Sequence, residues 1–574
     1  MNNNHNDSKQ YQWKIASTVP SEITARFPEW NIVTAQLLYN RQLTTQEDVD
    51  HFVLPDYGQD QHDPFLFRDM KKVVARIKQA VLKKQKIVIH GDYDADGVCG
   101  SAVLYKTLQK IGADVSVYLP HRDTEGYGLN LNTIQTLADA GTHLVITVDC
   151  GTSNKKEIAK AVELGMDVIV TDHHSEPPEL PKEACAMLNP KLSQETYPFR
   201  FLAGVGVSFK LCQALIREYA LGEAFEKWLL DLVAISTVTD FVPLIGENRV
   251  FVKYGLVVMK KNLRPGLRQL FSQMNVEVKT VSCETILFKV GPHINAAGRM
   301  KHANAAFEML VEENEEQAAL LAANIVQANK ERQRVSAQMS KRALEQAELQ
   351  KNEFVIIVEI DDCPIGLVGL VAGKVASTYH RPTFVVGRMG EEIAGSGRSI
   401  EQFDLIDHMH ALDRLFAKYG GHPMACGFTI KNAQAFEQFK AQMRERASAQ
   451  LASTDLRKIL NIEMVLELSL VDWKLIDVVE QFSPYGEGNP EPTFVSYGVR
   501  IEDIAFIGKN SDHVRLVVSQ GNVRKKCIGF GFGKEWYKQL HIGDIIDVTY
   551  HVGVNEWNGN REIQLLLQDI QKNV

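Results

Sequence analysis

The chain has 574 residues, of which 45% are apolar and 23% are charged, as in a soluble globular protein of several domains. This composition excludes disordered, collagen-like and coiled-coil classes for the chain as a whole. The formal net charge of −8 excludes a globally basic protein that packs nucleic acid, so a nucleic-acid site must be a local basic groove on an acidic body.

The cysteines and the N-terminus indicate the compartment. The eight cysteines are scattered without a CxxC pair, so neither a zinc knuckle nor a disulfide framework is expected. Residues 1–10 are polar and Asn-rich, and they lack the basic start and apolar run of a signal peptide. No apolar stretch approaches the roughly 18 residues of a membrane span. We therefore expect a reduced, cytoplasmic, soluble protein without membrane contacts.

A repeating pattern of short apolar runs begins at Lys86. Before it, helical stretches around 32–54 and 68–84 flank a Pro- and Asp-rich segment at 55–65. After it, β-branched runs end in acidic or Gly-rich clusters and alternate with helical stretches. These runs are 87–89, 144–148 and 168–171. They are typical of strands buried on both faces, and the alternation with helices predicts a parallel sheet, which binds ligands at the carboxyl ends of its strands.

The second half of the chain changes character twice. Residues 305–350, rich in Glu, Ala, Gln and Lys and free of Gly and Pro, predict one long helix, which we expect to be a strut rather than an oligomer contact. Strand and helix patterns return at 353, and beyond a polar linker several short strands predict a small β-barrel. We expect an α/β protein in five parts: an N-terminal extension of unknown role (1–50), a parallel-sheet domain (51–300), a connecting helix (301–350), a smaller α/β domain (351–450) and a β-barrel domain (451–574).

The strongest chemical signal is the segment HGDYDADG at 90–97, which places one His and three Asp directly after a strand. Such like charges repel one another unless a cation neutralises them, although a solvated acidic turn or a helix N-cap is an alternative. Similar clusters follow at 149–151 and 172–174, and a further Asp stands at 240. Four such sites carrying only His and Asp favour bound Mn²⁺ or Mg²⁺ over a structural origin.

These four segments resemble the four motifs of the DHH phosphoesterase superfamily, and among its members they are most similar to the bacterial single-strand-specific 5′→3′ DNA exonucleases. Segments 202–207, 291–299 and 394–399 support the resemblance, and GGHPMACG at 420–427 is similar to the signature of the DHH-associated domain, DHHA1. The chain departs from the pattern at Cys150, where Asn is expected, and at Thr239, where Ala is commoner. Neither departure changes an expected ligand.

The resemblance implies a site for two divalent cations, Mn²⁺ or Mg²⁺, and two-metal hydrolysis of phosphodiesters. The implied ligands are His90 and Asp94 for one ion, Asp96, His173 and Asp240 for the other, and Asp149 as the bridge between them. The expected catalytic residues are His174, Asp149 and Asp92. His174 would face the scissile phosphate, while Asp92, like Asp172, would orient ligands.

Phosphate recognition is expected from arginines in turn or Gly-rich segments, where backbone N–H groups and a guanidinium fork can hold a phosphate. Any one of them could equally be a surface residue or part of a structural ion pair. The resemblance implies a DNA-binding role and a pocket for the 5′-terminal phosphate. The expected substrate-binding residues are Arg122, Asn295, Arg299, Ser396, Arg398 and His422.

The C-terminal barrel is interpreted as an OB-fold. Basic residues alternate there with aromatic ones: Arg515, Arg524, Lys525, Lys526, Phe530, Phe532, Trp536 and Tyr537. Basic groups can follow a nucleic-acid backbone while aromatic faces stack on bases, although aromatic residues on strands are more often part of a core. A DNA-binding barrel is therefore an implication of the resemblance more than of this local pattern.

The resemblance thus implies a monomeric single-stranded-DNA-specific 5′→3′ exonuclease that releases 5′-mononucleotides in DNA recombination and repair. A single-strand binding protein and a RecQ-type helicase are the implied partners. One alternative is a DHH-family oligonucleotide or cyclic-dinucleotide phosphodiesterase, which the length and the extra C-terminal domain disfavour. Another is a catalytically silent DNA-binding scaffold, which the complete ligand set disfavours. The sequence leaves open the physiological metal, the processivity, the activity on RNA and the surfaces that bind partners.

Overall fold

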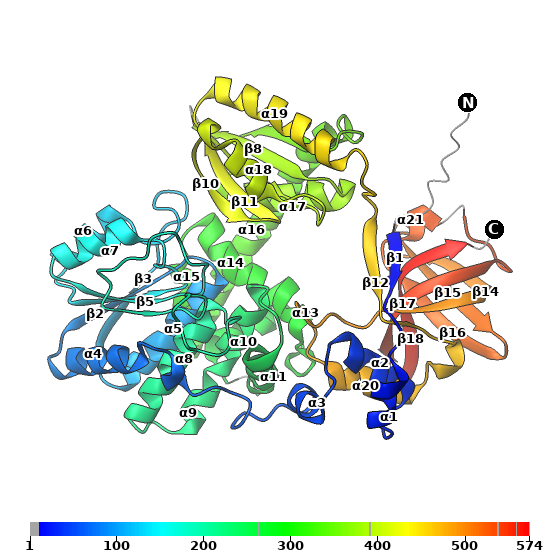
Figure 1. Ribbon diagram of the computed structural model, residues 1–574, viewed down its shortest axis with the longest axis horizontal. Helices are drawn as coiled ribbons and strands as arrows, with labels where there is room; N and C mark the ends of the chain where they lie inside the picture. The colour runs from blue at the N-terminus through cyan, green and yellow to red at the C-terminus, as the bar shows by residue number, and fades with distance from the viewer. Residues whose placement is uncertain (1–10, 262, 390–391, 537–538, 558, 573–574) are drawn as a thin grey trace. The chain divides into compact units, whose positions relative to one another are not determined.

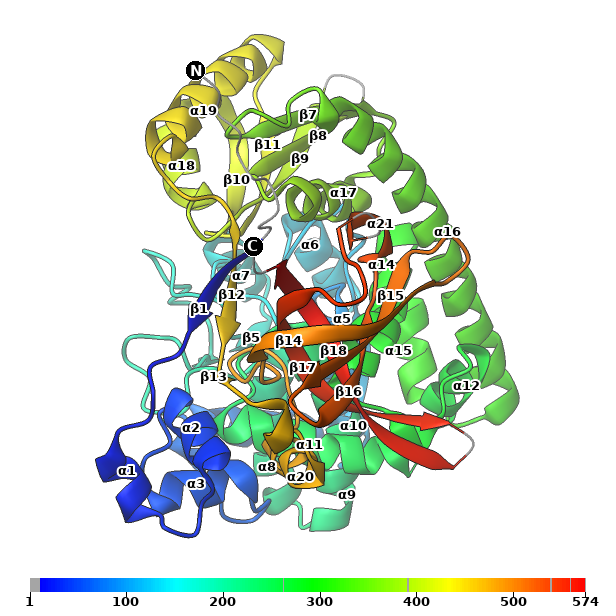
Figure 2. The same cartoon turned by 90° about the vertical axis from the view of Figure 1, so that its right-hand side faces the viewer.

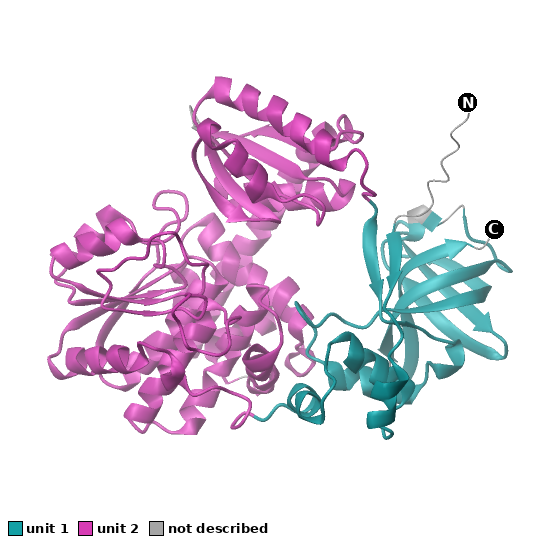
Figure 3. Cartoon of the chain, in the orientation of Figure 1, with its two compact units in different colours: residues 1–56, 457–574 teal, residues 57–456 magenta. Residues whose placement is uncertain are grey.

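The structure, a computed structural model, describes residues 11–572 apart from 262, 390–391, 537–538 and 558. The chain divides into two compact units (Figure 3). One comprises residues 57–456, and in the other the residues up to 56 join those from 457 onward. Among the described residues, no helix is both long and apolar enough to cross a membrane.

A five-stranded parallel sheet forms the first part of the larger unit (Figure 1). Its order is β3-β2-β4-β5-β6. Ile87 and Ile89 enter one hydrophobic core and Val88 enters another, because side chains alternate along a strand. This double burial explains the unbroken apolar runs in the sequence. The strands are β2 (Lys86–Gly91), β3 (Asp114–Tyr118), β4 (Leu144–Val148), β5 (Asp167–Thr171) and β6 (Ala186–Leu188).

Helices cover both faces of this sheet. The face that carries Val88 packs against α6 and α7, and the other face packs against α4, α5, α8 and the helices that follow. The α-helices are α4 (Met70–Leu82), α5 (Ala95–Lys110), α6 (Leu131–Asp139), α7 (Lys155–Glu163), α8 (Gly204–Glu218), α9 (Glu223–Trp228), α10 (Leu230–Thr239), α11 (Gly246–Lys260), α12 (Pro265–Gln273), α13 (Cys283–Thr285) and α14 (Gly291–Met300). Short turns are η1 (Pro64–Leu66), η2 (Val278–Thr280) and the π-helical η3 (Ile286–Val290).

The single helix predicted over 305–350 is two helices, α15 (Asn304–Val311) and α16 (Glu315–Glu348). The break occurs without Gly or Pro, because the Asn314 side chain caps α16 by accepting the Gln317 N–H at 3.0 Å. Figure 2 shows α16 leading from the helices of the first domain to α17 of the second. Its first half contributes Leu321 and Ile325 to the core of the first domain, and its second half contributes Ala343 to that of the second.

The second α/β domain has a mixed sheet of order β10-β11-β9-β8-β7. Helix α17 packs on one face together with α16, while α18 and α19 pack on the other. The strands are β7 (Ile356–Asp361), β8 (Thr383–Met389), β9 (Glu392–Arg398), β10 (Phe416–His422) and β11 (Ala425–Ile430). The helices are α17 (Ile365–Tyr379), α18 (Leu405–Ala411), η4 (Asp413–Leu415) and α19 (Ala433–Leu451).

The smaller unit contains a closed barrel. Strands β14, β15, β16, β18 and β17 follow one another, and the pairing of β14 with β17 closes the ring. Closure leaves no free sheet edge in the barrel. The elements are β12 (Lys458–Ile462), β13 (Met464–Val465), η5 (Leu468–Leu470), α20 (Trp473–Phe482), β14 (Phe494–Ile507), β15 (His513–Gln520), β16 (Val523–Gly529), α21 (Gly533–Trp536), β17 (Ile545–Trp557) and β18 (Asn560–Lys572).

The N-terminal segment belongs to this smaller unit. Strand β1 pairs in parallel with β12, and Trp13 Nε1 donates a hydrogen bond to Asp569 Oδ2 at 2.8 Å. Leu37 and Phe52 lie in one core with Phe482 of α20. The elements are β1 (Tyr11–Ile15), α1 (Ser21–Arg26), α2 (Ile32–Asn40) and α3 (Gln46–Val53). The predicted class, a parallel-sheet domain, a smaller α/β domain and a C-terminal barrel, is confirmed.

Candidate active site

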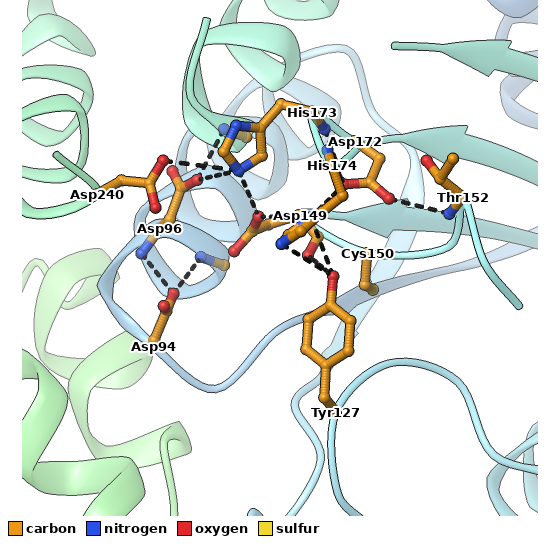
Figure 4. A network of polar contacts seen from close by, with 12 residues as sticks. Asp94, Asp96, Tyr127, Asp149, Cys150, Thr152, Asp172, His173, His174 and Asp240 are labelled. Carbon is orange, nitrogen blue, oxygen red and sulfur yellow. Dashed lines mark hydrogen bonds and ion pairs between the residues drawn. The ribbon is translucent and has the colours of Figure 1, made fainter. Parts of the chain in front are cut away.

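The carboxyl end of the parallel sheet gathers the acidic and imidazole residues singled out in the sequence. Strands β2, β4 and β5 each lead into one cluster, and Asp240 joins them from the end of α10 (Figure 4). Asp149 follows β4 with a left-handed backbone (φ +60°), which Asp tolerates better than most residues. The Asp149 N–H donates to the Thr171 carbonyl at 3.0 Å, and the carboxylate lies amid the cluster.

His173 faces three of these carboxylates. Its Nε2 lies 3.2 Å from Asp149 Oδ1. The distances from the same nitrogen to Asp96 Oδ2 and to Asp240 Oδ2 are both 3.6 Å. Side chains from two strand ends and two helix ends therefore point at one small volume, which is the geometry that a cation requires.

Asp172 holds the two histidines. Its Oδ1 accepts the backbone N–H of His173 (2.7 Å) and of His174 (3.1 Å) and lies 2.8 Å from His174 Nδ1. Its Oδ2 accepts the Thr152 N–H at 2.9 Å. Burial alone would raise the pKa of Asp172, but its hydrogen bonds and the charge of His174 lower it overall. Burial lowers the pKa of His174, yet contact with Asp172 raises it overall. The contacts of Asp172 suit the predicted orienting role.

Hydrogen bonds at helix N-termini fix the positions of the Asp94 and Asp96 carboxylates. Asp94 is the N-cap of α5, and its Oδ1 accepts the Asp96 N–H at 2.9 Å. The carboxylate of Asp96, a residue of α5, lies at the N-terminus of α8. Its Oδ2 accepts the Gly204 N–H at 2.7 Å, and its Oδ1 accepts the Val205 N–H at 2.8 Å. The Ser236 hydroxyl also donates to Asp96. The positive ends of two helices thus stabilise negative charge here.

Three groups of candidate ligand atoms occur in the described part of the chain, each with its atoms within 4.8 Å of one another. They are Asp149–His173–His174, Asp96–His173–Asp240 and Asp92–Asp94–Asp149. Asp92, expected to be an orienting group, therefore lies among candidate ligands beside Asp94. His90 is in none of the three groups, and its buried ring lies 5.4 Å from that of Tyr118.

Burial and mutual repulsion oppose ionisation of the carboxyl groups. Burial raises the pKa of Asp92, Asp149 and Asp240 well above the usual range, and neighbouring carboxylates raise it further. Burial lowers the pKa of His90 and of His173 to about 4, so both imidazoles are neutral at physiological pH. Without a positive partner, this set of charges is unfavourable.

The donor atoms themselves fit a divalent cation. Within the described ranges, five buried atoms of the cluster have no hydrogen-bond partner: His90 Nε2, Asp92 Oδ1, Asp149 Oδ1, His173 Nδ1 and Asp240 Oδ2. Buried polar atoms are normally paired, so carboxylate oxygens left unpaired in this cluster fit a bound cation. Carboxylate oxygens with neutral imidazoles suit Mn²⁺ or Mg²⁺.

Arginines gather at the N-terminal turn of α17. Arg299 Nη1 donates to the Gly366 carbonyl at 2.7 Å, and a Cβ placed on Gly366 would lie 3.7 Å from Arg122 Cδ. Arg398 Nη1 donates to Ser396 Oγ and to the Gly397 carbonyl, both at 2.8 Å. Burial lowers the pKa of Arg299 to about 10, and the nearby guanidinium groups contribute. Guanidinium groups that lie together at a helix N-terminus are an arrangement that suits a bound anion.

The remaining predicted substrate residues have different contacts. Asn295 Oδ1 accepts the Ala95 N–H at 2.8 Å and so joins α14 to the start of α5. His422, at the end of β10, is exposed. Partial burial lowers its pKa, and the charges of His174 and Lys191 lower it further, so the end of β10 lies within electrostatic reach of the metal cluster.

Three further candidate site residues were not identified from the sequence. The Tyr127 hydroxyl donates to the Asp149 carbonyl at 3.1 Å and lies 3.0 Å from His174 Nδ1. The sequence feature that could have indicated Tyr127 is the pair of glycines on either side of it, both of which have positive φ in the structure. Lys191 acts electrostatically on Asp240, and Arg332 acts on Arg299. Neither of these two cations lies in a motif.

The barrel aromatics divide between core and surface. Trp536 is buried and stacks on Phe532 with ring centroids 4.3 Å apart. Phe530 is 61% exposed and lies 5.4 Å from the His513 ring. Tyr537 lies outside the described residues. Phe530 is therefore a candidate stacking residue, whereas Trp536 belongs to the core.

Family models match three segments of the chain. The DHH family N-terminal domain matches residues 86–237, the DHHA1 domain matches 352–449 and the RecJ OB domain matches 462–569. The expected resemblance to the DHH phosphoesterases is confirmed.

Curated relatives and solved structures extend the match to almost the whole chain. The single-stranded-DNA-specific exonuclease RecJ of Bacillus subtilis is 36% identical, covering 98% of this chain and 71% of its own length. The RecJ of Haemophilus influenzae is 32% identical, covering 88% of this chain and 90% of its own. A crystal structure of RecJ with Mn²⁺ from Thermus thermophilus is 26% identical with a TM-score of 0.83, and the match covers 98% of this chain and 80% of that one.

Proposed function

This chain belongs to the RecJ family of single-stranded-DNA-specific exonucleases, and we propose that it removes nucleotides from the 5′ end of single-stranded DNA by metal-dependent hydrolysis. The family is that of a phosphodiester hydrolase acting on single-stranded DNA. Our proposal adds the 5′→3′ polarity, the 5′-mononucleotide product and the roles of individual residues. A role in DNA recombination and repair is consistent with this activity. The observation that carries the proposal is the convergence of Asp149, Asp240 and His173.

The residues that would hold the cations are those predicted from the sequence, with Asp92 added because its carboxylate lies beside Asp94 and Asp149. They are His90, Asp92, Asp94, Asp96, Asp149, His173 and Asp240. Mn²⁺ or Mg²⁺, when bound, would activate the attacking water and neutralise charge on the phosphoryl group. A crystal structure of the Thermus thermophilus RecJ contains Mn²⁺, and another contains Mg²⁺.

The chain's own residues would then position the reacting groups. Asp172 holds His174 by its Nδ1 at 2.8 Å, and the His174 side chain remains 36% exposed, so it can face a phosphate. The raised pKa of His174 favours its protonated form, which can donate a hydrogen bond to a phosphoryl oxygen as negative charge develops. The Tyr127 hydroxyl also contacts this ring, at 3.0 Å from Nδ1 and 3.4 Å from Nε2.

Polarity would come from the arginines. The 5′-terminal phosphate carries more negative charge than an internal phosphodiester, and a cluster of guanidinium groups binds it best. Arg122, Arg299 and Arg398, with Ser396, supply such a cluster at the N-terminus of α17. Asn295 and His422 would line the path between this cluster and the cations.

A short-oligonucleotide or cyclic-dinucleotide phosphodiesterase is the alternative hydrolase. The closed barrel with an exposed Phe530 favours a longer strand, because a dinucleotide has no need of a second binding domain. A silent DNA-binding scaffold is disfavoured, because a scaffold gains nothing from buried carboxyl groups that repel one another. The proposal also includes a monomeric state and a cytoplasmic location. Its expected partners are a single-strand binding protein and a RecQ-type helicase.

The test is digestion of a 5′-phosphorylated single strand with fluorescent labels at different positions, in Mn²⁺ or Mg²⁺. We expect mononucleotides from the 5′ end, no product from a blunt duplex, and no product with Asp149→Ala. Release from the 3′ end would refute the polarity. Cleavage of dinucleotides but not of long strands would favour the alternative.

A further inference from the structure

Phe241 has an unusual backbone for a bulky residue. It follows Asp240, the C-cap of α10, with a left-handed φ of +56°, and its side chain is 61% exposed. Helices commonly end on such a residue, but glycine is the usual choice because it has no Cβ to clash. Strained backbone of this kind clusters at functional sites. A large, exposed apolar ring held at this cost beside a candidate ligand is a candidate substrate contact.

A second exposed aromatic ring lies on the neighbouring loop. Phe201 is 48% exposed. The buried Asn248 ties the two loops together, since its Nδ2 donates to the Phe201 carbonyl at 2.6 Å and to the Pro243 carbonyl at 3.0 Å. Both rings are therefore presented by loops whose backbones are fixed by one buried amide.

Lys191 supplies a positive charge between the loop of Phe201 and the candidate metal cluster. Its neighbour Asn189 is bonded to the cluster, because Asn189 Nδ2 donates to the His174 carbonyl at 2.9 Å. The Lys191 carbonyl accepts Arg200 Nη2 at 2.6 Å, and its N–H donates to Asn189 Oδ1 at 2.9 Å, so the backbone is anchored. Its ammonium group has no ion-pair partner within the described ranges, which leaves the charge available to a ligand.

The arginines and Phe241 adjoin different carboxylates. The Arg122 guanidinium carbon lies 4.8 Å from the centre of the Tyr93 ring, and Tyr93 stands between Asp92 and Asp94 in the chain. Phe241, in contrast, directly follows Asp240, which belongs to a different group of candidate ligands. The candidate site for the terminal phosphate and the loop of Phe241 therefore flank the cluster. A strand whose first phosphate is bound by the arginines and whose next one is hydrolysed at the cluster must continue towards Lys191.

We propose that Phe241, Phe201 and Lys191 form the binding surface for the nucleotides on the 3′ side of the scissile phosphate. Lys191 contacts a backbone phosphate, and the two rings stack on unpaired bases. Stacking requires bases that are free of a complementary strand, so this surface also contributes to single-strand selectivity. The proposal rests on the proposed 5′→3′ exonuclease function.

The test compares Phe241→Ala, Phe241→Gly and Lys191→Ala with the wild type in binding a 5′-phosphorylated 20-nucleotide strand. Fluorescence anisotropy in EDTA measures binding without hydrolysis. Trp228→Ala is the matched control, because this aromatic residue is also exposed but lines a pocket with Lys106 at the far end of α5. We expect each of the three variants to bind about tenfold more weakly, and the control to bind like the wild type.

Further readouts separate a DNA contact from a structural effect. Phe241→Gly should keep or raise the melting temperature, because glycine relieves the left-handed strain, and yet lose affinity. Abasic nucleotides at positions 2–4 of the strand should weaken its binding to the wild type but not to Phe241→Ala. Abasic nucleotides at positions 15–17 serve as the control. Lys191→Ala should reduce the slope of log affinity against log salt by about 0.7.

The inference is overturned if the wild type digests the strand from its 5′ end while Phe241→Ala and Lys191→Ala bind and digest it equally well. It is also overturned if Phe241→Ala is sensitive to the abasic sites at positions 2–4 to the same degree as the wild type. A wild type that does not digest single strands would instead refute the proposed function. The two failures are therefore distinguishable.

Discussion

Replacing Asp149 by Asn should change stability and metal binding in opposite directions. The substitution keeps the shape of the side chain, and Asn tolerates the left-handed backbone at this position as well as Asp does. It removes one negative charge from the group formed with Asp92 and Asp94, whose ligand atoms lie within 4.8 Å of one another. It also removes the oxygen charge that lies 3.2 Å from His173 Nε2.

The magnitude follows from Coulomb's law. At 4.8 Å and an effective dielectric constant of about 20, each ionised pair repels by about 3.5 kcal/mol. The raised pKa of Asp149 lets the metal-free protein retain protons and relieves part of this repulsion. We therefore expect Asp149→Asn to stabilise the metal-free protein by about 2 kcal/mol, or about 2–3 °C in melting temperature for a unit that spans residues 57–456.

The pH dependence has a definite sign. A carboxyl group whose pKa is raised on folding stabilises the protein below its unfolded pKa, and this contribution is lost as the pH rises through the folded pKa. The melting temperature of the metal-free wild type should therefore fall as the pH rises from about 4 towards neutrality. The fall should be smaller in Asp149→Asn, because one such group is missing.

The assay is thermal unfolding with and without Mn²⁺, beside nuclease activity. Saturating Mn²⁺ at about 100 times its dissociation constant stabilises the wild type by about 2.7 kcal/mol, and Asp149→Asn should lose most of this shift and nearly all activity. Asp114→Asn, an exposed residue of β3 at the opposite end of the sheet, is the control and should behave as the wild type. A lower metal-free melting temperature in Asp149→Asn, or a retained Mn²⁺ shift, would refute the reasoning.

Other variants test separate parts of the account. Arg398→Ala should reduce the preference for a 5′-phosphorylated over a 5′-hydroxyl strand about tenfold in anisotropy, with an unchanged Mn²⁺ response; an unchanged preference would contradict the phosphate role. Tyr127→Phe should lower kcat about tenfold at an unchanged melting temperature, because it removes the hydroxyl beside His174; an unaltered kcat would count against it. Lys210→Met should destabilise the protein by about 3–5 kcal/mol in thermal unfolding, because the buried Glu247 carboxylate loses its ion-pair partner, and adding Glu247→Leu should restore part of this loss. No recovery would show that packing rather than charge is responsible.

The parallel sheet and its functional edge were predictable from local sequence. The runs at 87–89, 144–148 and 168–171 enter two cores at once, so they carry no polar alternation and cannot be mistaken for exposed strands. Each run ends where a His or Asp begins, and parallel strands bring those ends to one edge. The convergence of ligands thus follows from topology that the sequence pattern already implies.

Other features depend on contacts that local patterns do not encode. The pairing of β1 with β12 joins Tyr11 to Lys458, and no short-range signal specifies a partner so far along the chain. The break before α16 depends on one Asn side chain within a stretch that favours helix throughout. Phe241 is the clearest case, because phenylalanine disfavours the left-handed backbone that it adopts here, and this conformation becomes evident only in the folded chain.

The most direct test of the central claim is a crystal structure of the protein grown with Mn²⁺ and measured at the manganese absorption edge. Two anomalous peaks should lie between Asp94, Asp149 and Asp240, with the Asp149 carboxylate in contact with both. Peaks elsewhere, or none in this cluster, would contradict the assignment of these residues as metal ligands.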